Sequence, residues 1–141
     1  MEELLIISES NTLVKANNSK LNDKDSLVYL IDLYFKIHVV GSSDNTIDAK
    51  QRDLKLFIDF FFQLMETYNV NLWTPSITRS FQKCLLSQNI TSTGNVYKAT
   101  SVNRIMSSLK HFSRWLHKQR PLPAGNPFEG VKIIETDEPS W

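Results

Sequence analysis

Apolar residues recur every three or four positions along most of this chain, which is the spacing of a helix that buries one face. Four such stretches run from Asp25 or Ser26 to about Gly41, from Thr46 to about Glu66, from Thr74 to about Gln88 and from about Thr100 to Gln119. No two alternating stretches flank a hairpin turn, so no strand pair is expected. The pattern predicts an all-α fold made of four helices.

Each predicted helix has an apolar stripe that should face a common core. The stripes comprise Leu27, Leu30, Ile31, Tyr34, Phe35 and Ile37; Ile47, Leu54, Phe57, Ile58, Phe61 and Met65; Ile77, Phe81 and Leu85; and Val102, Ile105, Met106, Leu109, Phe112 and Leu116. Thr46 and Thr74 are placed to cap the second and third helices, and Pro75 suits a first helical turn. The opposite face of the second helix is expected to meet solvent through Asp48, Arg52, Lys55, Asp59 and Gln63.

The segments outside the predicted helices are polar or rich in proline. Residues 1–24 read as a flexible lead-in, and residues 89–96 as a polar loop. Pro121 and Pro123 prevent the last helix from continuing, and Asn126-Pro127 begins an extended segment. A chain of 141 residues fits one ordinary domain. We therefore expect a flexible segment at 1–24, a helical domain at 25–125 and a linker at 126–141.

Acidic residues are absent from Thr67 to Phe128, a run of 62 residues that holds eight Lys or Arg and two His. The formal net charge of +1 hides this imbalance, because all the acidic residues lie in the flanking segments. A field of one sign attracts polyanions such as nucleic acid or an anionic membrane surface. A solvated basic face that binds nothing would have the same composition, so the placement of the charges must decide.

Helical phasing gathers many of these charges on the side of the last helix that faces away from its apolar stripe. That side is centred on Thr100, Arg104, Ser107, His111, Arg114 and Lys118, with Asn103 and Lys110 at its border. Arg and Lys neutralise phosphates, while hydroxyl and amide groups bond to phosphates and base edges. Glu residues at four-residue spacing, which commonly support Lys-rich surface helices, are missing here. This face therefore carries the groups that DNA binding needs.

Other classes of function find little support in the sequence. The lone Cys84 has no ligand-spaced Cys or His partner and is interpreted as a small core residue. His111 and His117 lie six positions apart, about 120° from a shared helix face, which argues against a joint metal site. No phosphate-binding loop or catalytic constellation is visible, so we predict no catalytic residue, metal or cofactor. No signal peptide or membrane span is recognisable, and we expect a soluble, cytoplasmic protein.

Two stretches and a closing dipeptide have a recognisable order. Residues 43–54 read SDNTIDAKQRDL, residues 100–116 read TSVNRIMSSLKHFSRWL, and Asn126-Pro127 follows. In this order they resemble the start of the second helix, the fourth helix and the opening of the linker in the amino-terminal core-binding domain of tyrosine recombinases, the phage integrase and Xer-like family. The resemblance covers about residues 26–132.

The resemblance implies a SAM-like orthogonal bundle that clamps one side of a recombination-site duplex, while a separate catalytic domain takes the other. It implies that the second and fourth helices face the DNA, and Arg104 is the residue on which periodicity and resemblance agree best. Together with the charge pattern it gives as candidate DNA-binding residues Thr46, Lys50, Arg52, Lys98, Thr100, Ser101, Arg104, Ser108, Lys110, His111 and Arg114.

The sequence departs from the family pattern at two positions on the second helix. Lys50 stands where relatives often carry Tyr, which puts the contact made at that position in question. Asp48 is an anion near the amino end of a helix expected to face DNA, where phosphate would repel it.

Strand cleavage in this family uses a Tyr nucleophile with Arg, Lys and His from a carboxy-terminal domain. The four Tyr residues of this chain lie within or beside the predicted bundle, and Trp141 ends the sequence before such a domain, so we expect no cleavage by this chain. The resemblance implies a role in DNA integration and recombination, with double-stranded DNA as the partner, no membrane, a monomeric isolated domain and an oligomeric full-length protein on DNA.

Two alternatives remain open at this stage. A helical protein-interaction module could present the same basic face to an acidic partner. A helical substrate-binding part of another enzyme would need a concave apolar pocket, which the sequence does not indicate.

Overall fold

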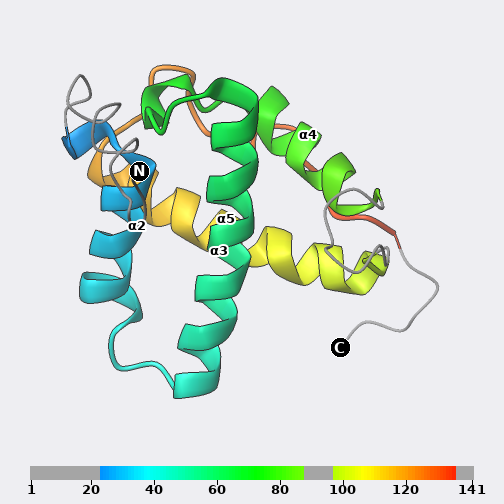
Figure 1. Cartoon of the computed structure of the whole chain (residues 1–141), viewed down its shortest axis with the longest axis horizontal. Helices are drawn as coiled ribbons and strands as arrows, with labels where there is room; N and C mark the ends of the chain where they lie inside the picture. Colours follow the sequence, from blue (N-terminus) through cyan, green and yellow to red (C-terminus); the bar gives the residue numbers. More distant parts are fainter. Residues whose placement is uncertain (1–22, 88–96, 136–141) are drawn as a thin grey trace, which may run out of the picture.

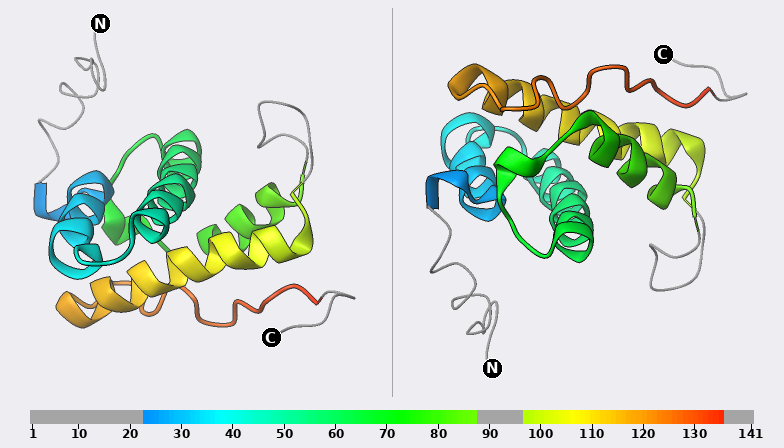
Figure 2. Two further views of the ribbon diagram at one scale, coloured as in Figure 1. Left: turned by 90° about the horizontal axis from the view of Figure 1, so that it is seen from below. Right: turned by 90° about the horizontal axis from the view of Figure 1, so that it is seen from above.

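The computed structural model describes residues 23–87 and 97–135, and this part of the chain consists largely of helices (Figure 1). The main helices are α2 (Leu27–Tyr34), α3 (Asp44–Met65), α4 (Pro75–Leu85) and α5 (Ala99–Gln119), with short helical turns at Asp23–Asp25, Phe35–Val39 and Val70–Leu72. The long helices α3 and α5 cross, with α2 near the end of α5 and α4 near its beginning (Figures 1 and 2). The predicted all-α bundle of four main helices is confirmed.

The helix starts follow from short hydroxyl side chains, though one cap differs from the prediction. Thr74 caps α4 as predicted, since its Oγ1 accepts from the Ile77 amide at 3.3 Å, and Pro75 opens the helix. The cap of α3 is Ser43, not Thr46, because Ser43 Oγ accepts the Thr46 amide at 3.2 Å. Thr46 therefore lies one turn inside the helix. The prediction missed this because residues 43–46 offer more than one polar side chain able to cap.

The first predicted helix is α-helical only to Tyr34, after which Phe35–Val39 form a wider, π-helical turn. The Val40 amide donates to the Phe35 carbonyl at 3.0 Å, which closes that turn. A turn that contains an extra residue shifts the phase of the side chains that follow it. Val39 is consequently buried, whereas Ile37 is 60% exposed, so the prediction that Ile37 belongs to the buried stripe is wrong.

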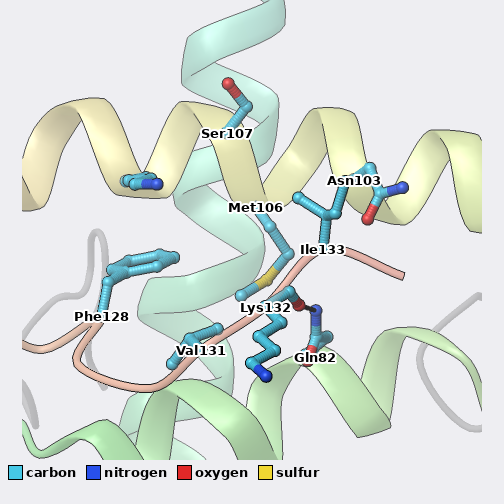
Figure 3. Close-up of a pocket in the computed structure, with 9 residues that line it drawn as sticks. Gln82, Asn103, Met106, Ser107, Phe128, Val131, Lys132 and Ile133 are labelled. Atoms are coloured by element: carbon cyan, nitrogen blue, oxygen red, sulfur yellow. Dashed lines mark hydrogen bonds between the residues drawn. The ribbon is translucent and has the colours of Figure 1, made fainter. Parts of the chain in front are cut away.

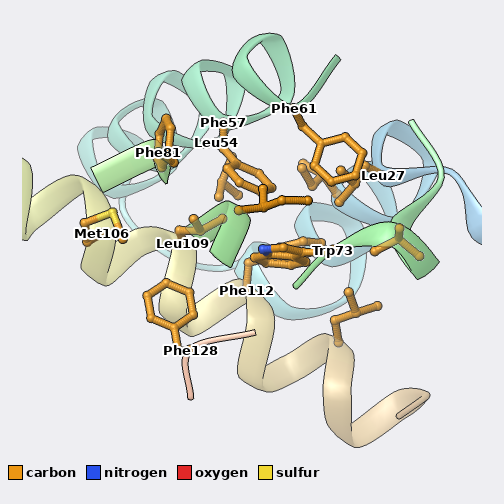
Figure 4. Packing of buried hydrophobic residues seen from close by; sticks show 14 of the residues in the cluster. Leu27, Leu54, Phe57, Phe61, Trp73, Phe81, Met106, Leu109, Phe112 and Phe128 are labelled. Atoms are coloured by element: carbon orange, nitrogen blue, oxygen red, sulfur yellow. The ribbon is translucent and has the colours of Figure 1, made fainter. Parts of the chain in front are cut away.

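The core is an aromatic and aliphatic cluster centred on Trp73, which lies in the α3–α4 connection (Figure 4). The Trp73 ring centroid is 4.9 Å from that of Phe57 on α3 and 6.2 Å from that of Phe112 on α5. Its indole N–H donates to Thr78 Oγ1 at 2.8 Å, so the one polar atom of this ring is satisfied inside the core. The six predicted stripe residues of α5 are all buried, as expected.

After α5 the chain turns back and runs along the bundle (Figure 2). Phe128 is buried in the core, Gln82 of α4 donates to the Lys132 carbonyl at 2.8 Å, and the Asn103 amide of α5 exchanges two hydrogen bonds of 2.9 Å with the backbone of Ile134. The sequence predicts an extended linker from Asn126, and residues 126–135 of that segment pack against α4 and α5. Buried Phe128 and the paired backbone of Lys132 and Ile134 account for this packing.

Some predicted features fall outside the described residues. They are most of the lead-in at 1–24, the loop at 89–96, position Gln88 and the end of the tail. Within the described residues, no helix is long and apolar enough to cross a membrane.

Candidate nucleic-acid interface

The crossing of α3 and α5 is held by polar side chains from both helices. Arg104 Nη1 of α5 donates to Asp53 Oδ2 of α3 at 2.7 Å, and Ser108 Oγ, one turn further along α5, donates to the same oxygen at 2.7 Å. One turn before Asp53 on α3, Lys50 Nζ lies 3.4 Å from His111 Nδ1. Candidate residues from two distant parts of the sequence therefore meet at one place on the surface.

Among the side chains that make these contacts, only Asp53 is acidic. It is 2% exposed. An unpaired carboxylate at such a depth would be costly, and the two donors compensate it. Arg104 covers the carboxylate from the solvent side, since its own side chain is 52% exposed. The surface above the acid is therefore formed by a guanidinium group.

Lys50 and His111 are two basic groups in direct contact. An ammonium group has donors only, so Nδ1 of a neutral His111 must be the acceptor. Burial lowers the pKa of Lys50 from its ordinary value. Burial also lowers the pKa of His111, and the charges of Lys50, Arg114, Lys110 and the neighbouring His38 lower it further. An anion bound between the two groups would relieve the repulsion that opposes a proton on His111.

Lys50 also lies near the aromatic side chain of Tyr34. Lys50 Nζ is 6.0 Å from the centre of the Tyr34 ring, and the His38 ring stacks on that ring at 5.3 Å. The Tyr34 side chain is fully buried, and its hydroxyl has no hydrogen-bond partner in the described part of the structure. Burial raises the pKa of this phenol. The ammonium group of Lys50 therefore lies over the face of the Tyr34 ring.

The rest of the outer face of α5 is polar and open. Arg104, Ser107, Lys110, His111, Arg114 and Lys118 are all exposed, as the helical phasing predicts. Between residues 97 and 119 no acidic side chain interrupts this face. We call these six residues, together with Lys50, the basic face. It extends for about four turns of α5, from Arg104 to Lys118.

One border of the basic face is formed by the carboxy-terminal segment (Figure 3). Helical phasing places Asn103 at this border, and its side-chain amide is hydrogen-bonded to the backbone of Ile134. A pocket of about 150 Å³ lies between Met106, Phe128 and Val131, with Ser107 and Lys110 at its rim. Pockets that hold small molecules are typically about 300–1,000 Å³. This hollow is thus too small for a typical substrate.

The amino end of α5 carries three further candidates. Lys98 is the residue before the helix and is exposed, Thr100 is exposed and Ser101 is half-buried. No side chain caps this helix start. Unsatisfied amides and the helix dipole make such an end favourable for a phosphate group.

Two candidates on α3 lie apart from the Lys50–His111 contact. Arg52 is exposed, but a side chain two residues from Lys50 leaves the helix axis about 160° away from it. Thr46 is exposed at the first turn, and its Oγ1 accepts from Ser43 Oγ at 2.9 Å. Asp48 is also exposed. The structure thus brings Lys50 to the basic face but does not bring Arg52 there.

Ser108 differs from the other candidates because its side chain is nearly buried. Its hydroxyl is used by Asp53, in the interior of the α3–α5 contact. The family resemblance gave Ser108 as a candidate but could not show that α3 covers it. Ser108 is therefore not among the proposed DNA contacts.

Some basic residues of the acid-free stretch have structural partners. Arg120 forms an ion pair with Asp25 at 2.8 Å and donates to Asn71 Oδ1 at 2.8 Å, which ties the end of α5 to the start of the bundle. Arg79 donates to the Glu129 carbonyl at 3.5 Å. Asp25, which lies outside the acid-free stretch, thus compensates part of the positive charge of that stretch. The cations in the middle of α5 remain exposed to solvent.

Asp53 was not among the candidate residues predicted from the sequence. Its position on the helical projection of α3 could have identified it. On a helical projection Asp53 falls beside Phe57 at the edge of the apolar stripe, whereas the other acids of α3 fall toward the solvent face. An acid in an apolar stripe needs a buried partner.

The described residues contain no group of three or more His, Cys, Asp or Glu that could hold a metal ion. Cys84 is half-buried on α4 and forms no disulfide. The groups that the basic face itself presents are hydrogen-bond donors and positive charges.

Comparison with known proteins gives one match. The sequence model of a family described as phage integrase, N-terminal SAM-like domain, matches residues 32–120, which is more than half of the chain. The match begins within α2 and includes the whole of α3, α4 and α5. No curated protein and no solved structure matches the chain.

Proposed function

Since the chain belongs to the phage integrase N-terminal SAM-like domain family, we propose that its basic face binds double-stranded DNA. Membership of this family supports a role in a phage integrase or related recombinase. The proposal adds that α5, with Lys50 of α3, lies against the duplex and holds one side of the recombination site.

The observation that carries the proposal is the open, acid-free surface at the α3–α5 crossing. Arg114, Lys110 and Lys118 have no ion pair within the described residues and are available to neutralise phosphates. A helix fits the width of a major groove, and most protein–DNA hydrogen bonds go to the sugar–phosphate backbone. The pairing of Lys50 with His111 supports a phosphate contact at this point, because two basic groups in contact favour an anion between them.

The proposed contacts divide into three groups. Lys50, Lys110, His111 and Arg114, with Lys118, would neutralise phosphates along the middle and end of α5. Lys98, Thr100 and Ser101 would receive a phosphate at the helix start. Arg104 would approach the bases, while Arg52 and Thr46 would contact the backbone only if the duplex extends around α3.

The domain itself is a non-catalytic part of integrases. Its proposed contribution is to position a recombinase on its site in DNA integration and recombination, in the cytoplasm. The domain binds as a monomer in this proposal, and the full-length recombinase assembles as an oligomer on DNA.

A binding comparison tests the proposal. The full chain is titrated, by fluorescence anisotropy, into a labelled 30-base-pair duplex and into labelled poly-glutamate of similar charge. Tighter binding to the duplex, by about tenfold or more, supports the proposal, because a helix in a groove adds contacts that charge alone does not supply. Equal or tighter binding to poly-glutamate would instead favour a protein-interaction module with an acidic partner.

A further inference from the structure

We propose that Asp53 is a positioning residue for Arg104, and that it fixes the guanidinium group so that its remaining N–H donors read a base edge of the duplex. The inference rests on the proposed function, and it separates Arg104 from the other basic residues of the face. Those residues neutralise phosphate charge, whereas Arg104 would supply sequence preference.

Two short hydrogen bonds hold the buried carboxylate of Asp53 in place. Its carboxylate is 2% exposed, and Oδ2 accepts hydrogen bonds from both Arg104 and Ser108 at 2.7 Å. Ser108 is attached to the same helix as Arg104, so the carboxylate is held against α5 by two donors one turn apart. Hydrogen bonds to an ionised group are strong and directional. The orientation of the Arg104 side chain is therefore set before any ligand arrives.

The pairing also changes what Arg104 offers to DNA. Its positive charge is compensated by the buried carboxylate, so its contribution to counterion release should be small. A guanidinium has five N–H donors, and the contact of Arg104 with Asp53 uses only Nη1. With the side chain 52% exposed, donors remain on the solvent side. A group with little net charge and oriented free donors suits recognition of a base edge better than attraction of a phosphate.

Preorganisation adds to this argument. A free arginine loses rotamer freedom when it binds, whereas Arg104 has lost much of that freedom on folding. The planar donor fork matches the O6 and N7 acceptors of guanine in the major groove. The chemical class of the target is therefore a pair of acceptors on a purine edge.

The alternative is that the ion pair serves only to join α3 to α5. A buried pair is weak evidence of a stabilising role, since desolvation offsets much of its attraction. The two roles predict different results for substitutions that keep the fold. A structural role alone gives no change in base preference.

The test measures base preference and salt dependence separately. The full chain and its variants Arg104→Lys, Asp53→Asn and Arg79→Lys are each incubated with a duplex pool that carries a randomised segment, and bound duplexes are sequenced. The same proteins are titrated with one fixed duplex at several salt concentrations. Circular dichroism and thermal unfolding report whether each variant is folded. Arg79→Lys is the matched control, since it makes the same Arg-to-Lys change in an exposed side chain of α4, outside the basic face.

We expect the wild-type chain to prefer one base pair by roughly tenfold to one-hundredfold. Arg104→Lys should lose this preference without a change in salt slope, because a lysine can keep the charge pair but not the fork. Asp53→Asn should lose the preference and make the slope of log K against log salt steeper by about 0.9, because one positive charge is released. Arg79→Lys should keep both properties.

Other outcomes would overturn the inference. A wild-type chain that binds duplexes without base preference, or a preference that survives in either Arg104→Lys or Asp53→Asn, leaves Asp53 with a structural role only. If Asp53→Asn does not fold, the base preference of Arg104→Lys alone decides between the two roles. This variant should fold, because its lysine can still pair with the buried Asp53 carboxylate. A wild-type chain that binds no duplex at low salt overturns the proposed function, and with it this inference.

Discussion

Lys50 Nζ on α3 lies 3.4 Å from Nδ1 of His111 on α5, so two basic side chains that are 61 positions apart in sequence share one contact. The contact is favourable only while His111 is neutral, because a second proton would place two cations side by side. This relationship makes both the stability of the bundle and its binding of anions sensitive to pH.

The first prediction concerns stability and pH. Burial and then the charges of Lys50, Arg114, Lys110 and His38 lower the pKa of His111 in the folded chain below its ordinary value of 6.5. The unfolded chain therefore binds this proton more readily, so the free energy of unfolding should fall as pH drops below about 6.5. The loss is complete once pH is below the lowered pKa of the folded state. The effect should be modest, since the side chain is exposed to solvent.

Urea denaturation at pH 7.5 and at pH 5.5 measures this effect. The variant His111→Gln should lose less stability between the two pH values than the wild-type chain does. The two proteins differ only at this position, so the comparison isolates His111. An equal loss in both proteins would show that the Lys50–His111 contact has no influence on proton binding.

The second prediction concerns DNA binding and pH. A phosphate placed against Lys50 and His111 favours the protonated imidazole, which raises the pKa of His111 in the complex. Binding should therefore take up a proton, and affinity for duplex DNA should rise as pH falls from 7.5 to 5.5. His111→Gln should flatten this dependence. The control His117→Gln should retain it, because His117 accepts from the Leu122 amide at 3.4 Å, away from Lys50.

The third prediction separates the basic face from charge in general. Arg114→Ala removes an exposed cation of α5, and we expect the slope of log K against log salt to become shallower by about 0.9. Lys83→Ala removes the same charge from an exposed position on α4 and should leave the slope unchanged. Anisotropy titrations between low and moderate salt give both slopes. Equal changes in the two variants would mean that bulk charge, and not one helix face, attracts DNA.

The fourth prediction concerns the core. Thr78→Val leaves the buried indole N–H of Trp73 without its acceptor and should cost about 1–3 kcal/mol of unfolding free energy. Ser76→Ala on the exposed side of the same helix should change stability by less than about 0.5 kcal/mol. Chemical denaturation followed by tryptophan fluorescence measures both. Similar stabilities for the two variants would show that this hydrogen bond contributes little.

The helices could be predicted because their information is local. The stripe of α5 and the Thr74-Pro75 start of α4 depend on residues within one or two turns of each other. The extra residue of the turn at Phe35–Val39 could not be predicted, because the same apolar spacing is compatible with a continued α-helix. The exposure of Ile37 follows from that turn.

The candidate site was only partly predictable, because its decisive contacts join distant segments. Helical phasing placed Arg104 on the outer face, yet its partner Asp53 lies 51 positions earlier on another helix. Arg120 likewise pairs with Asp25, and the carboxy-terminal segment covers Asn103. No local pattern shows which cation of an acid-free stretch will meet an acid from outside it.

The salt dependence of duplex binding by the wild-type chain tests the central claim most directly. With about four to six phosphate contacts on the basic face, log K should fall linearly with log salt at a slope of about −3.6 to −5.4. Affinity that is absent at low salt, or that is the same at low and high salt, would contradict the claim that this face binds DNA.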